Sequence, residues 1–286
     1  MALFGKKKYT LVKVKKKDIP LGIWSKCPAC EAPIYVKELK NNFNVCLQCG
    51  YHFSLTAPER VELLMDEGTF TEFDKSMSSL DPLEFKGPKT YKEKLTGDQK
   101  ATGLTDAVIT GKGKIHGREA VIAVTDSRFI MGSMGAVVGE KITRAVEKAT
   151  AEKLPVVIVS GSGGGARMYE GVFSLMQMAK TCAALAKHHE AGLLYISVLT
   201  NPTMAGIMAS FAGVGDCIIA EPKALIGFTG PRVIEQTIRQ KLPEGFQSSE
   251  FLLAHGLIDM IAKRNELKNI ISRVIEYSQS EVVSSS

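Results

Sequence analysis

Four of the six cysteines form two CxxC pairs, Cys27 with Cys30 and Cys46 with Cys49, separated by fifteen residues. Each CxxC turn can present two thiolates to one metal ion, and four thiolates complete the tetrahedral shell that Zn²⁺ prefers. Because protein ligands fill all four positions, the spacing predicts one structural zinc ion. A disulfide or redox use of these cysteines is the alternative, and His52 is an alternative ligand nearby.

A second stretch with chemical potential is VVIVSGSGGGARM, residues 156–168, where a run of β-branched residues gives way to glycines and serines. Consecutive glycines let the backbone turn with its N–H groups exposed, and a following helix adds its positive amino-terminal end. Such N–H groups can stabilise the enolate oxygen of a thioester, and losing one donor of this kind costs about 10²–10³ in rate. The composition therefore predicts an oxyanion hole within residues 160–167.

Three other interpretations of glycine-rich segments fit less well. Gly161, Gly163 and Ala166 satisfy the GxGxxA dinucleotide pattern, but no acidic residue ends the next predicted strand. A serine-hydrolase elbow requires glycine where Ser160 stands. The segment 135–141 misses the spacing of a phosphate-binding loop. The oxyanion hole is thus the preferred interpretation.

The elements that must position this loop follow an alternating pattern from Asp106 onward, which predicts an α/β domain. Strands are predicted at 106–110, 119–126, 155–160, 192–199 and 216–228. Helices are predicted at 139–153, 170–189, 205–213 and 231–241. In the longest helix, apolar residues repeat at helical spacing, and we expect them to face the core: Val172, Leu175, Met176, Ala179, Cys182, Ala183 and Ala186.

The amino-terminal third divides into three predicted segments. Residues 1–26 hold eight lysines and a single aspartate, so they carry the whole excess of the net charge of +6 and form a basic flexible arm. Residues 27–50 form a zinc ribbon, whose segment 33–45 is read as two strands around a turn at Asn41 and Asn42. Residues 51–100 connect the ribbon to the main domain and include one helix that begins after Thr56 and stops before Gly68.

Composition also limits the class of protein. Apolar residues make up 45% and charged residues 23% of the 286 residues, the balance of an ordinary globular chain. Neither a secretory signal nor an apolar run of about 20 residues is found, so we expect a cytoplasmic protein without a membrane partner. The ribbon and the basic arm leave nucleic-acid binding as a second hypothesis beside the enzymatic one.

Seven segments together resemble one family, the beta subunits of bacterial acetyl-coenzyme A carboxylase carboxyltransferase. The resemblance extends over about residues 20–265. The segments are the cysteine ribbon, TEFD at 71–74, DSRFIMGSMG at 126–135, GGARM at 164–168, SLMQMAKT at 174–181, LLYISVLTNPT at 193–203 and EPKALIGFTGPRVIEQTI at 221–238.

This resemblance implies a crotonase-like ββα superhelix over residues 101–286, with the zinc ribbon before it. It implies transfer of CO₂ from carboxybiotin to acetyl-CoA, which forms malonyl-CoA for fatty-acid synthesis; another acyl-CoA is the alternative substrate. Carboxybiotin would arrive on a biotin carboxyl carrier protein that a separate biotin carboxylase charges. A carboxyltransferase alpha subunit would complete an α2β2 assembly.

The resemblance also implies site residues. Gly164 and Gly165 would donate N–H groups to the thioester oxygen, and Gly163, Ala166, Arg167 and Gly206 would bind substrate around them. For Arg167 the alternatives are that it holds the loop or partner contacts, or that it forms a surface ion pair. Lys141 and Arg128 are candidates for the CoA phosphates.

The chain departs from the family pattern at two places. It reads SGSGGGARM where the family usually has SASGGARM, so one glycine is extra and Gly163 is an alternative donor. Met204 and Ala205 stand where the family tends to have threonine and glycine, which changes one wall of the predicted pocket.

Overall fold

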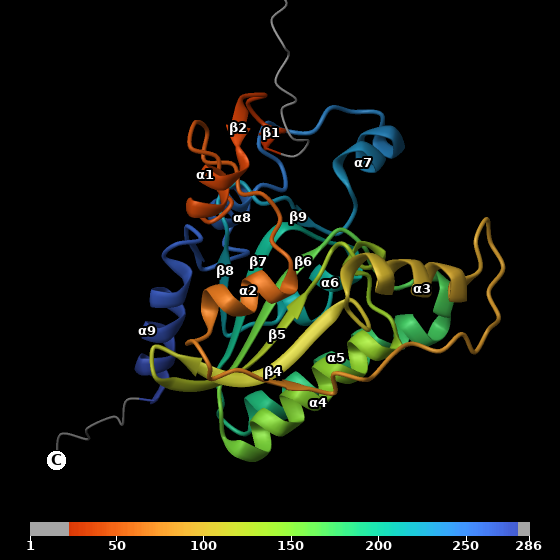
Figure 1. Cartoon of the computed structure of the whole chain (residues 1–286), viewed down its shortest axis with the longest axis vertical. Helices are drawn as coiled ribbons and strands as arrows, with labels where there is room; N and C mark the ends of the chain where they lie inside the picture. The colour runs from red at the N-terminus through yellow and green to blue at the C-terminus, as the bar shows by residue number, and fades with distance from the viewer. Residues whose placement is uncertain (1–22, 280–286) are drawn as a thin grey trace, which may run out of the picture.

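The structure, a computed structural model, describes residues 23–279. An eight-stranded sheet forms its centre, in the order β10-β8-β7-β6-β5-β4-β3, with β9 paired to the end of β7 (Figure 1). Strands β5, β6, β7, β8, β9 and β10 are linked by parallel pairs, whereas β3 and β4 run antiparallel to their neighbours. The strands are β3 (Thr71–Phe73), β4 (Val108–Ile115), β5 (Arg118–Thr125), β6 (Val156–Ser162), β7 (Tyr195–Met204), β8 (Cys217–Ala220), β9 (Ile226–Gly227) and β10 (Met260–Ile261).

Helices bury both faces of this sheet. Successive side chains of a strand point to opposite sides, so each central strand contributes to two cores. Val121 and Ala123 of β5 belong to the core under α4 and α5, while Ile122 and Val124 belong to the core under α2 and α9. The helices are α1 (Val36–Asn41), α2 (Ala57–Leu64), α3 (Tyr91–Thr102), α4 (Ala136–Glu152), α5 (Val172–Glu190), α6 (Ala205–Met208), α7 (Pro231–Ile238), α8 (Ser249–Ala254) and α9 (Leu267–Gln279). The predicted α/β alternation is confirmed.

Local sequence signals set several element boundaries. Thr56 caps α2 through a capping box with Glu59, as its position before the apolar run predicts. Strands β4 and β5 are joined through His116 and Gly117 alone, both with positive φ. The two strands therefore extend into the segment 111–118, which separates the predicted strands. No helix among residues 23–279 has the length and apolarity to cross a membrane.

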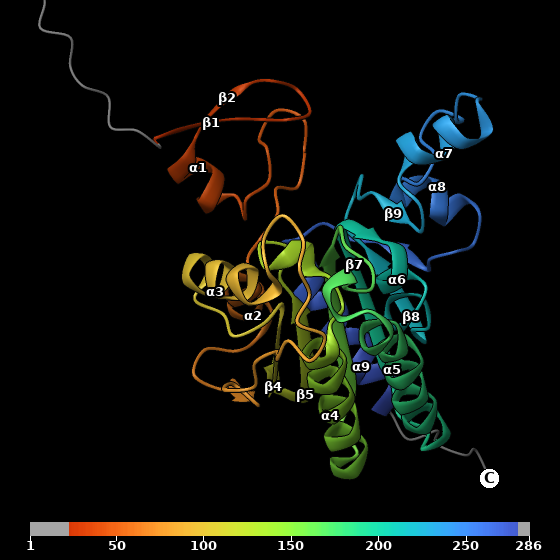
Figure 2. The same ribbon diagram turned by 90° about the vertical axis from the view of Figure 1, so that its right-hand side faces the viewer.

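The ribbon differs from the predicted hairpin. Its two strands are β1 (Trp24–Lys26) and β2 (Pro33–Tyr35), which flank the first CxxC turn, and the residues up to Asn41 form α1 instead of a second strand. The helix is favoured because it buries Leu39 against Cys27 and Cys46. The ribbon and α7 lie at the same end of the molecule (Figures 1 and 2). Most of the predicted basic arm lies outside the described residues.

The apolar face of α5 is exposed, which corrects the prediction that it faces the core. Val172, Leu175 and Met176 are 60%, 55% and 56% exposed. The buried face carries Ala184 and Leu185, which join the core, and polar residues that are satisfied locally. Ser174 donates to the carbonyl oxygen of Arg167, and His188 hydrogen-bonds to Thr150 of α4. Periodicity identifies an apolar stripe but not the side on which a partner element lies.

Candidate active site and zinc centre

The four predicted ligand cysteines form one cluster at the base of the ribbon. Their Sγ atoms all lie within 4.8 Å of one another, with 3.7 Å between Cys27 and Cys49 and 3.8 Å between Cys30 and Cys46. Sulfurs bound tetrahedrally at a Zn–S distance of about 2.3 Å are separated by about 3.8 Å. The cluster therefore fits one structural zinc ion. His52 is not part of the cluster, and its Nδ1 lies 2.9 Å from the carbonyl oxygen of Gly50.

Removal of the zinc is expected to unfold the ribbon and leave the sheet folded. Trp24, the one tryptophan of the chain, lies in β1 with its ring 5.7 Å from that of Tyr35, so tryptophan emission reports on the ribbon. A chelator should shift this emission, and added Zn²⁺ should restore it, because the metal supplies much of the folding free energy of so small a module.

The matched variants are Cys30→Ser, which should lower the zinc content, and Cys182→Ser, outside the cluster, which should retain one zinc per chain. A ribbon whose tryptophan emission stays unchanged after all zinc is lost would contradict this prediction.

Three backbone hydrogen bonds join the glycine-rich loop after β6 to the segment after β5. Gly164 N donates to the carbonyl oxygen of Met131 at 3.1 Å, Met134 N donates to Gly165 O at 2.9 Å, and Arg167 N donates to Met134 O at 2.8 Å. The first bond corrects one expected role. The N–H group of Gly164 already has an acceptor in this conformation, so it is not free for a thioester oxygen.

Gly165 and Ala166 keep their N–H groups without an acceptor among residues 23–279. Both residues line a cavity of about 430 Å³, together with Arg128, Met131 and Ser133. Main-chain N–H groups at the edge of such a cavity can stabilise negative charge on a substrate oxygen. The N–H group of Gly163 also has no acceptor there, but Gly163 is not part of this lining.

The segment from Pro202 to Gly206 packs directly on the glycine loop. A Cβ atom added to Gly165 would lie 3.0 Å from Ala205 Cβ and 3.2 Å from Gly206 N. Ala205 has a φ of +54°, in the region that favours glycine, where the family tends to have glycine. Met204 is buried, and neither it nor Ala205 nor Gly206 lines the cavity. Ala205 and Gly206 act on the glycine loop from behind, through their contact with Gly165, which corrects the expectation that Gly206 binds substrate directly.

Arg167 holds the loop from inside the protein. Its guanidinium is fully buried and donates to Asp106 Oδ1 at 2.8 Å, to Tyr91 Oη at 2.8 Å and to the carbonyl oxygen of Ser133 at 3.1 Å. Burial alone would lower the pKa of Arg167, but the charge of Asp106 raises it above its usual value. No part of this side chain reaches the solvent, which corrects both the expected substrate contact and the alternative of a surface ion pair; the contacts agree with the other alternative, that Arg167 holds the loop.

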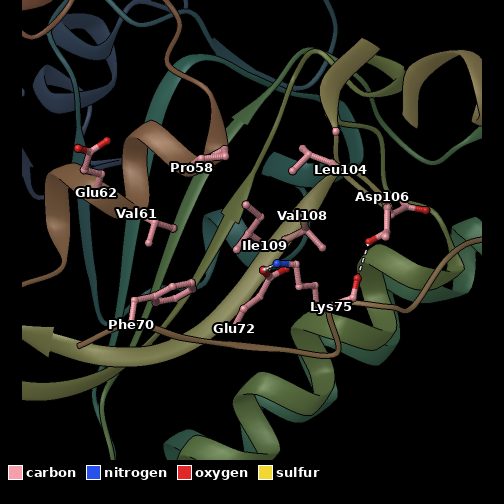
Figure 3. Close-up of a pocket in the computed structure, with 12 residues that line it drawn as sticks. Pro58, Val61, Glu62, Phe70, Glu72, Lys75, Leu104, Asp106, Val108 and Ile109 are labelled. Atoms are coloured by element: carbon pink, nitrogen blue, oxygen red, sulfur yellow. Dashed lines mark hydrogen bonds and ion pairs between the residues drawn. The ribbon is translucent and has the colours of Figure 1, made fainter. Parts of the chain in front are cut away.

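Further residues complete this network, and sequence reasoning did not identify them. Tyr91 donates to Glu170, whose second carboxylate oxygen accepts the N–H of Ala136 at the start of α4. Asp106 also borders a second cavity of about 390 Å³, between α2 and β4 (Figure 3). That cavity contains none of the predicted site residues. Helix α3 corrects the prediction of a single helix within the connecting segment 51–100; the capping box of Thr90 with Glu93 is the local signal that could have identified it, but nothing local indicated what Tyr91 contacts.

The two basic candidates for CoA phosphates have different environments. Lys141 is buried, and its Nζ donates to the carbonyl oxygen of Val108 at 3.0 Å; burial lowers its pKa. It cannot reach a phosphate, which corrects that expectation. Arg128 is 41% exposed at the cavity and pairs with Asp126 at 2.7 Å, and this hydrogen bond raises the pKa of Arg128.

A buried ion cluster joins the ribbon to the main domain. Glu221 accepts hydrogen bonds from Arg60 and Arg264, and Arg264 donates to the carbonyl oxygens of Phe43 and Asn44 in the ribbon at 2.8 and 3.2 Å. Burial by itself would raise the pKa of Glu221, but the two arginines lower it to about 2. The carboxylate therefore stays charged at neutral pH and fixes Arg264 against the ribbon.

Comparison with known proteins agrees with these two modules. Residues 53–244 match the carboxyl transferase domain family, and residues 24–49 match the acetyl-CoA carboxylase zinc finger domain. The acetyl-coenzyme A carboxylase carboxyl transferase subunit beta of Desulforamulus reducens is 57% identical, with 96% of this chain and 97% of the relative covered. The subunit of the same name from Rhodopirellula baltica is 56% identical, with 92% and 84% covered.

Solved structures show the same fold. The transcarboxylase 12S structure with methylmalonyl-coenzyme A and methylmalonic acid bound is 27% identical, with a TM-score of 0.65; the match covers 77% of this chain but only 40% of that chain. A Pseudomonas malonate decarboxylase hetero-dimer is 24% identical, with a TM-score of 0.61 and 78% and 86% covered. The crotonase-like carboxyltransferase fold with an amino-terminal zinc ribbon is thus confirmed.

Proposed function

The chain belongs to the family of acetyl-coenzyme A carboxylase carboxyltransferase beta subunits, and from this premise we propose how it takes part in the reaction. The family's reaction moves a carboxyl group from carboxybiotin to acetyl-CoA and forms malonyl-CoA. The N–H groups of Gly165 and Ala166 donate hydrogen bonds to the thioester oxygen. The observation that supports this placement is that both N–H groups have no acceptor among residues 23–279, although both residues line the same cavity.

These two donors act on the charge that develops when acetyl-CoA becomes an enolate. Negative charge on the thioester oxygen grows as the enolate forms and is already larger in the transition state than in the bound substrate, so fixed N–H groups lower the barrier more than they favour substrate binding. The lining of the cavity includes no histidine and no carboxylate, and the role that this chain supplies there is charge stabilisation. Bound carboxybiotin supplies the carboxyl group. Arg128, at the same cavity, contacts the CoA phosphates.

An alpha subunit covers the exposed apolar face of α5. Val172, Leu175 and Met176 on this face are all more than half exposed, and so is Met168, which lies between the glycine loop and the helix. Apolar patches of this kind on a soluble subunit mark protein interfaces. The site of the complete enzyme is therefore closed by the partner, and the carrier protein delivers carboxybiotin to the same place.

The decisive measurement is malonyl-CoA-dependent carboxylation of biotin by purified chain mixed with the alpha subunit. We expect activity from the mixture and none from the chain alone. A mixture that forms the complex but carries out no exchange with malonyl-CoA, while it exchanges with another malonyl-type CoA thioester, would reassign the substrate. A complex with no exchange of either kind would overturn the proposed function.

The α5 interface has its own test. Leu175→Glu places a charge in the apolar contact, and we expect the affinity for the alpha subunit to fall at least about tenfold, because an unpaired charge is costly to bury. Lys187→Glu, at the carboxyl end of the same helix, is the control for a change of charge alone. Sedimentation of the mixed subunits measures both. Unchanged association of Leu175→Glu would place the interface elsewhere.

A further inference from the structure

A single side-chain amide connects the zinc ribbon to the segment 202–206, which packs on the glycine loop. Asn201 Nδ2 donates to Tyr51 Oη at 3.2 Å. Tyr51 lies two residues after Cys49 and packs against the core of the ribbon. Asn201 Oδ1 accepts the N–H of Leu225, just before β9, at 3.1 Å. Because the oxygen of the amide is held by an N–H group, its NH₂ group must face Tyr51. Both ends of the amide are therefore used, and its orientation is determined.

The residues that follow Asn201 rest on the glycine loop. Pro202 lies against Gly163, where an added Cβ atom would be 3.4 Å from Pro202 Cγ. Ala205 lies against Gly165, as the corresponding distance of 3.0 Å shows. Thr203 Oγ1 donates to the carbonyl oxygen of Ser160, in the strand that leads into the loop. A shift of Asn201 is thus transmitted to the residues that carry the free N–H groups.

The ribbon has a separate attachment that does not involve this amide. Arg264 donates to two ribbon carbonyl oxygens, and Lys223 Nζ lies 3.4 Å from the carbonyl oxygen of Cys49. Loss of the Tyr51 hydroxyl therefore leaves the ribbon docked. The hydrogen bond between Tyr51 and Asn201 connects the ribbon to the segment that packs on the glycine loop, whereas the hydrogen bonds of Arg264 hold the ribbon on the main domain.

We propose that Asn201 is a positioning residue for carboxyl transfer, which holds the segment 202–206 against the glycine loop in a position set by the zinc-loaded ribbon through Tyr51. The inference rests on the proposed function. Asn201 does not touch the reacting atoms. It acts through the backbone that packs on Gly165, so its loss should change the turnover number more than the KM for the acyl-CoA.

The test is a double-mutant cycle in the complex with the alpha subunit. Tyr51→Phe removes one hydroxyl, and Asn201→Ala removes the whole bridge. A hydrogen bond of this kind corresponds to about two- to tenfold in rate. We expect kcat to fall within that range for Tyr51→Phe and further for Asn201→Ala, with KM for malonyl-CoA changed less than twofold. In the Asn201→Ala background, Tyr51→Phe should have no further effect. Tyr277→Phe, an exposed tyrosine on α9, is the control.

Zinc content and the thermal midpoint of each variant separate positioning from folding. One zinc per chain with unchanged kcat in Tyr51→Phe, or additive effects of the two changes on kcat, would overturn the proposal. Should Asn201→Ala fold poorly, Tyr51→Phe alone decides, because it keeps the ring and its contact with Phe53. Absence of transfer in the parent complex would instead overturn the proposed function.

Discussion

Gly165→Val lowers carboxyl transfer by about 10²–10³-fold in the result we expect, with little change in zinc content or in association with the alpha subunit. A Cβ atom at this position would lie 3.0 Å from Ala205 Cβ and 3.2 Å from Gly206 N, so the loop must move away from its wall. The N–H group of Gly165 then no longer points to the place where the thioester oxygen is held. Loss of one such donor lowers the rate by about 10²–10³-fold. Exchange of biotin and malonyl-CoA by the complex measures it.

Gly97→Ala is the matched control, because an added methyl group there meets no atom within 4 Å and α3 tolerates alanine. Its activity should equal that of the parent. Gly164→Val tests the structural hydrogen bond to Met131 and not a donor to substrate. Its Cβ would lie 2.9 Å from Ser133 Cβ and would displace that bond. Transfer by Gly165→Val within about threefold of the parent would place the donors elsewhere.

Arg167→Met is expected to lower the free energy of unfolding by about 3–5 kcal/mol, the usual cost of removing one partner of a buried ion pair. Methionine fills much of the volume but leaves the Asp106 carboxylate without its bidentate partner, in a site with no exposure to solvent. Denaturant unfolding measures the loss, and activity should fall with it because the glycine loop is no longer held by Ser133 and Asp106.

Arg144→Met is the control for this variant. Arg144 is half exposed, and solvent screens its pairs with Glu140 and Asp74, so the change should alter the free energy of unfolding little. Adding Asp106→Asn to Arg167→Met removes the buried charge, so the double variant should recover part of the lost stability. A loss below about 1 kcal/mol for Arg167→Met would mean that solvent reaches Asp106 after the change.

The amino-acid sequence by itself determined the features that depend on neighbours along the chain. Two CxxC turns bring their own sulfurs together, so the four zinc ligands follow from spacing alone. The capping box at Thr56 and the alternation of β-branched and amphipathic segments likewise identify α2 and the α/β domain. The glycine loop was also recognisable, because a strand that ends in consecutive glycines exposes backbone N–H groups wherever it lies.

Only the tertiary structure decided which of those N–H groups stays free, because the carbonyl oxygen that captures Gly164 belongs to Met131, 33 residues earlier in the chain. The same holds for Arg167, whose partner Asp106 is 61 residues away, and for α5, whose apolar stripe gives its spacing but not its neighbour. Hydrogen-bond pairing and burial between distant segments are set by how the elements pack against one another. A local pattern contains no information on that packing. The sequence therefore identified the segments that could do the chemistry, but not which of their N–H groups and side chains are free to do it.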